Sequence, residues 1–298
     1  MAVFLCFITS RLLLQTDILM ISPLGPEATA AFSVPGRLMV IDAIIAFALG
    51  PVVSVAVSRE NQSQKKHAVI RSSLGFTFVL SLFLVCIGFL LYPIAVDNFV
   101  VDSRTKSLAL DAVFWMTLSI PIKLLVFITT MCLFACEQGH RVSIIYVVTL
   151  TANALLNWLL IYHLNFGFSG SYIATVIVSV LELAWLLWLT ARLTEGWPFS
   201  RFQWQWLQKI IQQAGAEWGR LVSWQAEGII ILALLASKME WFPIFSAFGV
   251  ISEFSALLLM PLIALMRTTA MQIAAAYPGA QRLCCITQGK GHLTDVVI

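Results

Sequence analysis

Long uninterrupted runs of apolar residues constrain this chain more than any other feature of its sequence. A helical run of about 20 apolar residues is long enough to cross the hydrocarbon core of a bilayer. Eight such runs divide the chain, at residues 2–21, 38–58, 72–96, 109–135, 143–164, 169–193, 217–237 and 243–276. The chain is 60% hydrophobic and only 11% charged, unlike a soluble domain. We therefore expect an all-α, polytopic membrane helix bundle with about eight transmembrane helices.

Basic residues predict how these spans are oriented. Eleven lysines and arginines fall in the connections after even-numbered spans, and four fall in those after odd-numbered spans. Because basic connections stay in the cytoplasm, the even-numbered connections are expected there. The net charge of +3 is small and spread through the connections, which argues against a nucleic-acid partner.

One acid, Asp17, lies well inside the first apolar run. An ionised carboxylate is costly in hydrocarbon, so acids retained there are functional by default. Two interpretations stay open: a structural acid neutralised by a proton or by a base such as Lys123, or an acid that binds and releases a cation. Burial favours the neutral form and a nearby cation favours the ionised form, so a movable environment makes a usable switch.

Polar residues repeat every three or four positions on two later spans, which places each set on one helix face. The set on the fifth span is Tyr146, Thr149, Asn153 and Asn157, and the set on the sixth is Thr175, Ser179 and Glu182. Each face is either interhelical hydrogen-bonding surface or the wall of a cavity. The residues alone leave both alternatives open.

A weak internal repeat relates the two ends of the chain. The stretch "AAFSVPGRL" at 30–38 aligns with "PIFSAFGVI" at 243–251, and each follows a span with an acid, Asp17 in the first and Glu227 in the second. Repeated helix bundles are the usual build of secondary transporters. Residues from 217 onward are therefore expected to begin a second copy of the first helix pair.

Several motifs, in order, resemble the multidrug and toxic-compound extrusion (MATE) family of efflux transporters. The stretch "TDILMISPLGPEATAAFSV" resembles that family's opening helix and the loop after it. The motifs that follow are "ALGPVVSVAVSRE", "SIPIKLLVF", "CEQGHR", "TANALLNWLLIYHLNFGFSGSYIATV", "LVSWQAEGIIILALLAS" and "MPLIALMRTTAMQIAAAYPGA". Together they cover nearly the whole chain.

The resemblance implies a division into lobes. Family members have twelve helices in two six-helix lobes, so about eight helices suggest a fragment of a longer protein. The implied parts are a six-helix lobe at 1–193, a cytoplasmic inter-lobe linker at 194–216 with an amphipathic surface helix, the first two helices of a second lobe at 217–277, and a polar tail at 278–298.

The resemblance also implies a function and a site. It implies a monomeric, multi-pass transporter of the bacterial inner membrane that exports small organic, cationic or amphipathic molecules by H⁺ or Na⁺ antiport. No cofactor is implied besides the coupling ion, and Na⁺ is a candidate ligand of Asp17. The implied coupling and substrate residues are Asp17, Asn153, Asn157, Thr175 and Glu227, with Tyr146, Thr149, Lys123 and Ser179 as further lining. Proton-driven members tend to carry a second acid where this chain has Asn157, which cannot titrate.

Other functions are weighed against this one. A flippase for lipid-linked saccharides of the same superfamily is the alternative, favoured only by the intramembrane bases Lys123 and Arg267. A non-transporting fragment is a further alternative. An enzyme is not expected, because the sequence has no P-loop, HExxH or GxSxG motif and its four histidines are scattered at loop edges. Asp42 and Glu253 are expected to lie at the membrane interface rather than in the central cleft.

Overall fold

The structure is a computed structural model, and it describes residues 2–38, 40–60, 62–100, 103–194, 196, 203–236, 258–259 and 261–274. Its elements are helices: α1 (Ala2–Ile21), η1 (Ser22–Leu24), α2 (Pro26–Leu38), α3 (Val40–Arg59), α4 (Ser63–Phe99), α5 (Ser103–Ala135), α6 (Gly139–Trp158), η2 (Leu159–His163), α7 (Gly167–Thr194) and α8 (Trp204–Ala236). These ranges contain no strand, and the expected all-α class is confirmed.

Six helices in the described ranges are long and apolar enough to cross a membrane: α1, α3, α4, α5, α6 with η2, and α7. They correspond to the first six predicted spans. α4 and α5 begin earlier than expected, at Ser63 and Ser103, because each helix continues from the apolar run into a polar segment. The seventh predicted span lies within α8, and most of the eighth lies outside the described residues, apart from helical segments at 258–259 and 261–274.

Helix α2 corrects the sequence interpretation, which treated the residues after the first span as a loop. Pro26 occupies the first position of α2 and Glu27 lies in its first turn. Proline is favoured there because its missing N–H has no helical partner, and an acid in the first turn complements the helix dipole. Ala28 and Ala31 on the same helix are buried. This segment therefore packs as a helix although it is too short to span a bilayer.

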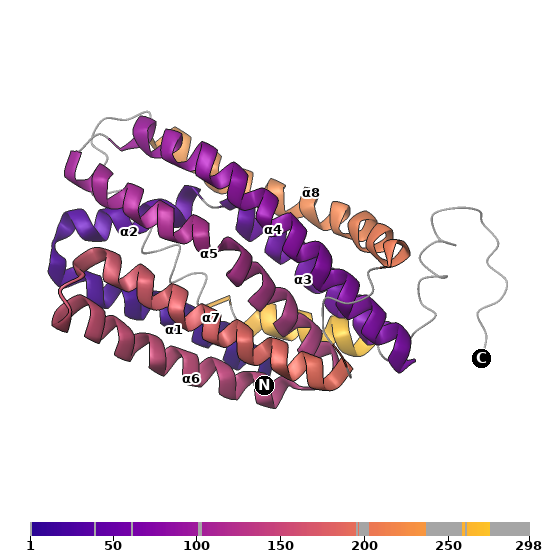
Figure 1. Cartoon of the computed structure of the whole chain (residues 1–298). Coiled ribbons are helices and arrows are strands. Elements are labelled where there is room, and N and C mark those ends of the chain that lie inside the picture. Colours follow the sequence, from indigo (N-terminus) through magenta and orange to yellow (C-terminus); the bar gives the residue numbers. More distant parts are fainter. Residues whose placement is uncertain are drawn as a thin grey trace.

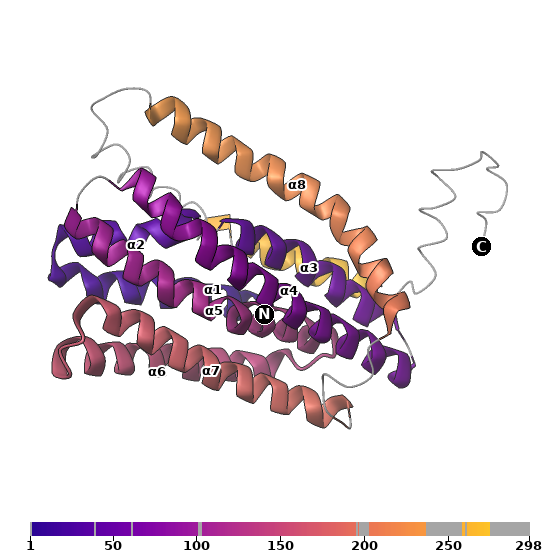
Figure 2. The ribbon, with the colours of Figure 1, turned by 45° about the horizontal axis from the view of Figure 1, so that its top comes forward.

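Helix α5 lies at the centre of the bundle. It packs against α2, α3, α4, α6 and α7, and a larger share of it is buried than of any other span in the described ranges. α1 packs against α6, and α6 against α7. α8 packs against α3 and α4, on the opposite side of the bundle from α6 and α7 (Figures 1 and 2).

The outer faces of the spans carry many exposed large apolar side chains. Phe83, Leu90, Leu155 and Leu181 are each about 60% exposed or more. Extensive apolar surface on a protein marks contact with another apolar phase. Combined with the length of the spans, this surface fits contact with lipid tails.

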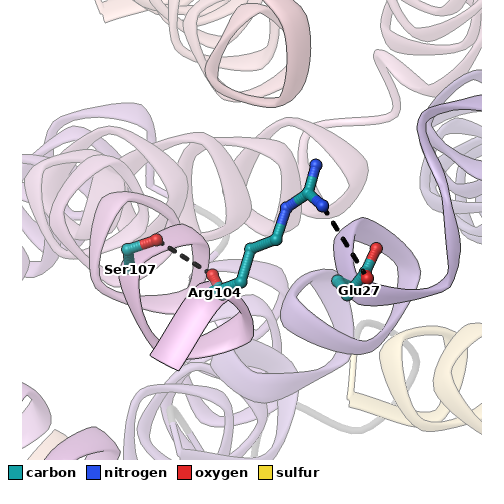
Figure 3. Close-up of polar contacts among 3 residues, drawn as sticks. All are labelled: Glu27, Arg104 and Ser107. Carbon is teal, nitrogen blue, oxygen red and sulfur yellow. Dashed lines mark hydrogen bonds and ion pairs between the residues drawn. The ribbon is translucent and has the colours of Figure 1, made fainter. Parts of the chain in front are cut away.

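Polar contacts join helix ends at both ends of the bundle. The Arg71 guanidinium donates from α4 to the Thr194 carbonyl of α7 at 2.8 Å, and the Gln203 backbone N–H donates to the Ser72 hydroxyl at 3.1 Å. Near the other ends of these helices, Glu27 at the start of α2 and Arg104 at the start of α5 form an ion pair of 4.0 Å (Figure 3). Because this pair is exposed, it contributes at most about 1 kcal/mol.

The segment that the sequence predicts as an inter-lobe linker, 194–216, is partly helical. The expected surface helix and the expected seventh span form one uninterrupted helix, α8, which begins at Trp204. Its first half has an apolar side on which Leu207, Ile210 and Ala214 are buried, while Trp204 and Ile211 are exposed. This pattern is that of an amphipathic helix packed along one side.

Candidate functional site

Asp17 lies on α1, is only 4% exposed, and is surrounded by hydrogen-bond donors from two other helices. The side-chain amides of Asn153 and Asn157 on α6 both donate to its Oδ1, at 2.6 and 2.5 Å. The Thr175 hydroxyl on α7 lies 3.3 Å from its Oδ2. Four of the five coupling residues nominated from the sequence are therefore in contact. An arrangement of donors alone complements an ionised carboxylate.

The contacts of Thr175 are weaker than those of the two asparagines. Its hydroxyl has a single hydrogen and three acceptors within reach: the Ser171 carbonyl at 3.0 Å, Asp17 Oδ2 at 3.3 Å and Asn153 Oδ1 at 3.5 Å. The shortest of these contacts lies within its own helix. Thr175 therefore closes the side of the site, and the amides hold the carboxylate.

Helix periodicity explains how α6 presents both amides to one carboxylate. Asn153 and Asn157 are four residues apart, so they lie one above the other on one face, and both are fully buried. A π-helical turn, η2, follows directly after them. From this turn the Tyr162 hydroxyl donates to the Met20 carbonyl of α1 at 2.7 Å. This bond attaches the end of the helix that carries Asp17.

The turn between α6 and α7 depends on two left-handed residues. Asn165 has φ of 54° and Gly167 has φ of 57°. Glycine adopts this conformation readily because it has no Cβ to clash, and asparagine does so because its short polar side chain can hydrogen-bond locally. The reversal brings α7 back along α6 and places Thr175 opposite Asn153.

The four polar residues on one face of α6 are all buried, but only two of them touch Asp17. Tyr146 and Thr149 are buried on the same face. The Tyr146 hydroxyl lies 3.2 Å from the Thr130 hydroxyl of α5, and the Thr149 hydroxyl donates to the Tyr146 carbonyl at 3.0 Å. These two residues lie nearer the start of α6 and do not contact Asp17.

Of the three polar residues expected on one face of α7, only one contacts Asp17. Thr175 reaches Asp17, Ser179 is half-buried outside the cluster, and Glu182 is buried two turns further along the helix. Glu182 interacts electrostatically with Tyr146 and with Cys6. It belongs to a second polar cluster, separate from that of Asp17.

Lys123 on α5 is half-buried and lies within electrostatic reach of two carboxylates, those of Asp17 and Asp42. Its ammonium contacts the Met116 sulfur at 3.0 Å. It forms no direct ion pair with either acid among the described residues. Lys123 therefore interacts with Asp17 and Asp42 by longer-range electrostatic attraction and not by direct contact.

Asp42 on α3 is buried between helices, and its expected position at the membrane interface stays a prediction. It is 9% exposed, and its Oδ2 accepts a hydrogen bond from the Tyr92 hydroxyl of α4 at 3.1 Å. Its Oδ1 is buried and has no hydrogen-bond partner within the described ranges. An acid near the start of an apolar span could be noticed in the sequence, but nothing there indicated Tyr92 as its partner.

The structure describes the candidates of the predicted second repeat less fully. Glu227 belongs to α8, but its side chain lies outside the described part of the structure, as does the whole of Glu253. Arg267 is half-buried in the helical segment 261–274. The expected role of Glu227 therefore stays a prediction.

A cation at Asp17 would find several oxygen atoms but only one carboxylate among the described residues. Across the described residues, no group of three or more His, Cys, Asp or Glu side chains could hold a metal ion. The oxygens near Asp17 are its own two, Asn153 Oδ1, the Thr175 hydroxyl, and Asn157 Oδ1, which is buried without a partner. Such a set suits a proton or a weakly bound monovalent cation better than a tightly held divalent ion.

Comparison with known proteins decides the family. The family model MatE matches residues 2–159. The chain belongs to the MatE family. Members of this family are transporters and not enzymes, so the chain is part of a membrane transporter family with several apolar spanning helices. No curated protein sequence matches the chain.

Solved structures of MATE transporters share the fold. A transporter of the MOP superfamily from Pyrococcus furiosus, described as having a binding pocket of reverse polarity, has a TM-score of 0.80 at 18% identity over 93% of this chain and 63% of its own. An outward-facing multidrug resistance MATE transporter of the MOP superfamily gives 0.79 at 18% identity, with 93% and 63% covered. A MATE structure in a bent conformation gives 0.80 at 18% identity, with 93% and 64% covered. The chain thus spans slightly less than two thirds of the length of these MATE transporters.

Proposed function

We propose that this chain belongs to a cation-coupled exporter of small organic molecules, in which Asp17 binds and releases the coupling ion. The observation that carries the proposal is the buried Asp17 carboxylate held by donors from α6 and α7. A carboxylate of this kind inside a span is expensive to keep, so it is retained for function. The coupling ion is H⁺ or Na⁺, and the exchange is antiport.

Asn157 supplies a route for the site to accept a cation. In the ionised state its amide nitrogen donates to Asp17 Oδ1, and its own Oδ1 is unpartnered. A half-turn of this amide exchanges donor for acceptor at the same place. A protonated Asp17 then donates to Asn157 Oδ1, and a sodium ion finds the same oxygen as a ligand.

Cation binding changes how firmly α1 is held. Hydrogen bonds to a charged group are roughly twice as strong as those between neutral groups. Neutralising Asp17 therefore loosens the attachment of α1 to α6, while Tyr162 still holds its end. Coupling follows if the substrate prefers one of the two resulting arrangements, since a ligand shifts an equilibrium only by its differential affinity.

The remaining parts of the proposal follow the family. The substrates are cationic or amphipathic organic molecules, because the cluster offers acidic and amide groups in an apolar lobe. The transporter works as a monomer in a bacterial inner membrane, with the connections after even-numbered spans in the cytoplasm.

The test is energised efflux of a fluorescent organic cation from cells that lack their own exporters and express this chain. Asp17→Asn is expected to abolish efflux while the protein still inserts. Asparagine keeps the shape of the side chain but is always neutral, so it cannot bind and release the coupling ion. Asp111→Asn is the matched control, since Asp111 is an exposed acid on α5. Unchanged efflux in Asp17→Asn contradicts the role proposed for Asp17.

A further inference from the structure

The interior of the bundle holds three charged groups that do not neutralise one another. Asp17 comes from α1, Asp42 from α3 and Lys123 from α5. Two carboxylates and one ammonium leave one negative charge when all three are ionised. An uncompensated charge in a low-dielectric interior is costly, so the group is stable with one more cation bound.

The titratable groups that surround this cluster do not supply that cation. Tyr92 from α4 interacts with Asp42, and Tyr172 from α7 interacts with Asp17. Both are neutral as phenols and add a charge only on losing a proton. From α6 the cluster receives only the two asparagine amides. Within the described ranges, Lys123 is the cation that interacts electrostatically with either acid.

Asp42 has the features of a binding group rather than a structural one. Nine tenths of its surface is buried, yet only one of its oxygens is hydrogen bonded. The other, Oδ1, is buried without a partner in the described structure. A structural carboxylate is normally satisfied at both oxygens, so this oxygen is open to a proton, a sodium ion or the Lys123 ammonium.

Lys123 is placed to serve either acid. Its ammonium contacts a thioether sulfur, a weak acceptor that leaves most of its hydrogen-bonding capacity unused. Lysine has a flexible four-carbon stem and a compact charge, so it can move between nearby partners. When a cation neutralises Asp17, the ammonium is free to pair with Asp42, and the reverse holds when the cation lies at Asp42.

We propose that Asp42 is a second cation-binding acid of this lobe, and that Lys123 is the resident counter-ion which it shares with Asp17. The pair of acids then binds one exchangeable H⁺ or Na⁺ in total. Asp42 thus supplies the second carboxylate that Asn157 does not. This inference rests on the proposed role of Asp17 in cation exchange.

The consequence for the fold is a connection between the ion site and α8. Asp42 lies on α3 and its partner Tyr92 on α4, and both of these helices pack against α8. The Lys123 ammonium therefore pairs with α3 when the cation is at Asp17, and with α1 when the cation is at Asp42. Through α3 this exchange connects Asp17 with α8, the helix in which the predicted second repeat begins.

The test counts exchangeable protons on the purified chain by infrared difference spectroscopy of protonated carboxyl groups between mildly alkaline and mildly acidic pH. The wild-type chain is expected to give one such group beyond the background of the exposed acids and of the buried Glu182, which belongs to a separate cluster, as is the control Asp111→Asn. Asp42→Asn is expected to lose this signal although Asp17 is intact, because Lys123 then neutralises Asp17 permanently. Lys123→Met, which keeps the stem and removes the charge, is expected to give two protonated carboxyls.

The double variant decides between charge balance and structural damage. Asp42→Asn with Lys123→Met again has one acid and no base, so the signal of one carboxyl is expected to return. A wild-type signal in Asp42→Asn, or no increase in Lys123→Met, overturns the inference. If Asp42→Asn does not fold, the increase in Lys123→Met alone carries the decision. Loss of the signal in Asp17→Asn with no effect of Asp42→Asn refutes only this inference, whereas no effect of Asp17→Asn refutes the proposed function.

Discussion

The strength of each contact to Asp17 can be measured by double-mutant cycles, and the structure predicts their order. The perturbations are Asp17→Asn, which removes the charge, combined in turn with Asn153→Leu, Asn157→Leu and Thr175→Val, which remove the hydrogen-bond donor and keep a branched side chain. Hydrogen bonds to an ionised group contribute about 1.5–3 kcal/mol. Both amide contacts are short, at 2.6 and 2.5 Å, so each asparagine is expected to couple to Asp17 within that range.

Thr175 is expected to couple far less. Its single hydroxyl hydrogen is divided among three acceptors, and the nearest is the Ser171 carbonyl at 3.0 Å rather than Asp17. The expected coupling is below about 0.5 kcal/mol, the level at which separate substitutions are additive. The measurement is the free energy of unfolding of the purified chain in micelles, for the single and double variants of each cycle.

The same cycles report the ionisation state of Asp17. Between neutral groups in membranes, interhelical hydrogen bonds average only about 0.6 kcal/mol. The asparagine coupling is therefore expected to be large at alkaline pH, where Asp17 is ionised, and to fall to about that value on acidification. Additive asparagine cycles at alkaline pH, or a Thr175 coupling as large as that of Asn157, would refute the reasoning.

Three further predictions concern packing and chemistry around the site. Gly50→Ala is expected to lower the melting temperature by the equivalent of about 1–3 kcal/mol, because the added methyl group meets the ring of Phe127; an unchanged melting temperature would show that the ring moves freely. Tyr92→Phe is expected to lower the free energy of unfolding by about 1–3 kcal/mol in denaturant titrations at alkaline pH, because it leaves the buried Asp42 carboxylate without its hydrogen bond. A variant with a higher free energy of unfolding would contradict this role of Tyr92. Burial raises the pKa of the Cys136 thiol. In a chain whose other cysteines are alanine, maleimide is therefore expected to react with Cys136 more slowly at neutral pH than with a free cysteine peptide, and faster as the pH rises. An equal rate at neutral pH would contradict that effect of burial.

The Asp17 cluster could be predicted from the sequence because its pattern is local. Asn153 and Asn157 share a face through helical spacing alone, and an acid within an apolar run needs polar neighbours. The resemblance to a family then indicated which helices meet. The structure was needed only to show that the amides reach the carboxylate.

Other features could not be predicted because they depend on helix rotation and on packing between distant segments. The bond from Tyr92 to Asp42 joins two long apolar helices whose relative rotation no periodicity determines. The division of the α6 stripe, with Tyr146 directed to Thr130, has the same cause. Helix α2 was missed because its proline and glycine residues are typical of a loop, while its buried alanines pack it as a helix.

The π-helical turn at Leu159–His163 lets the end of α6 absorb a change in chain length. Such a turn holds one residue more than an α-helical turn would. Deleting one residue there restores regular α-helix, and the residues beyond keep nearly the same direction relative to Asn157, because the wider turn had already taken up the extra residue. A second deletion would rotate Tyr162 by about 100° away from the carbonyl of Met20, so the end of the first helix tolerates one lost codon at this point but not two.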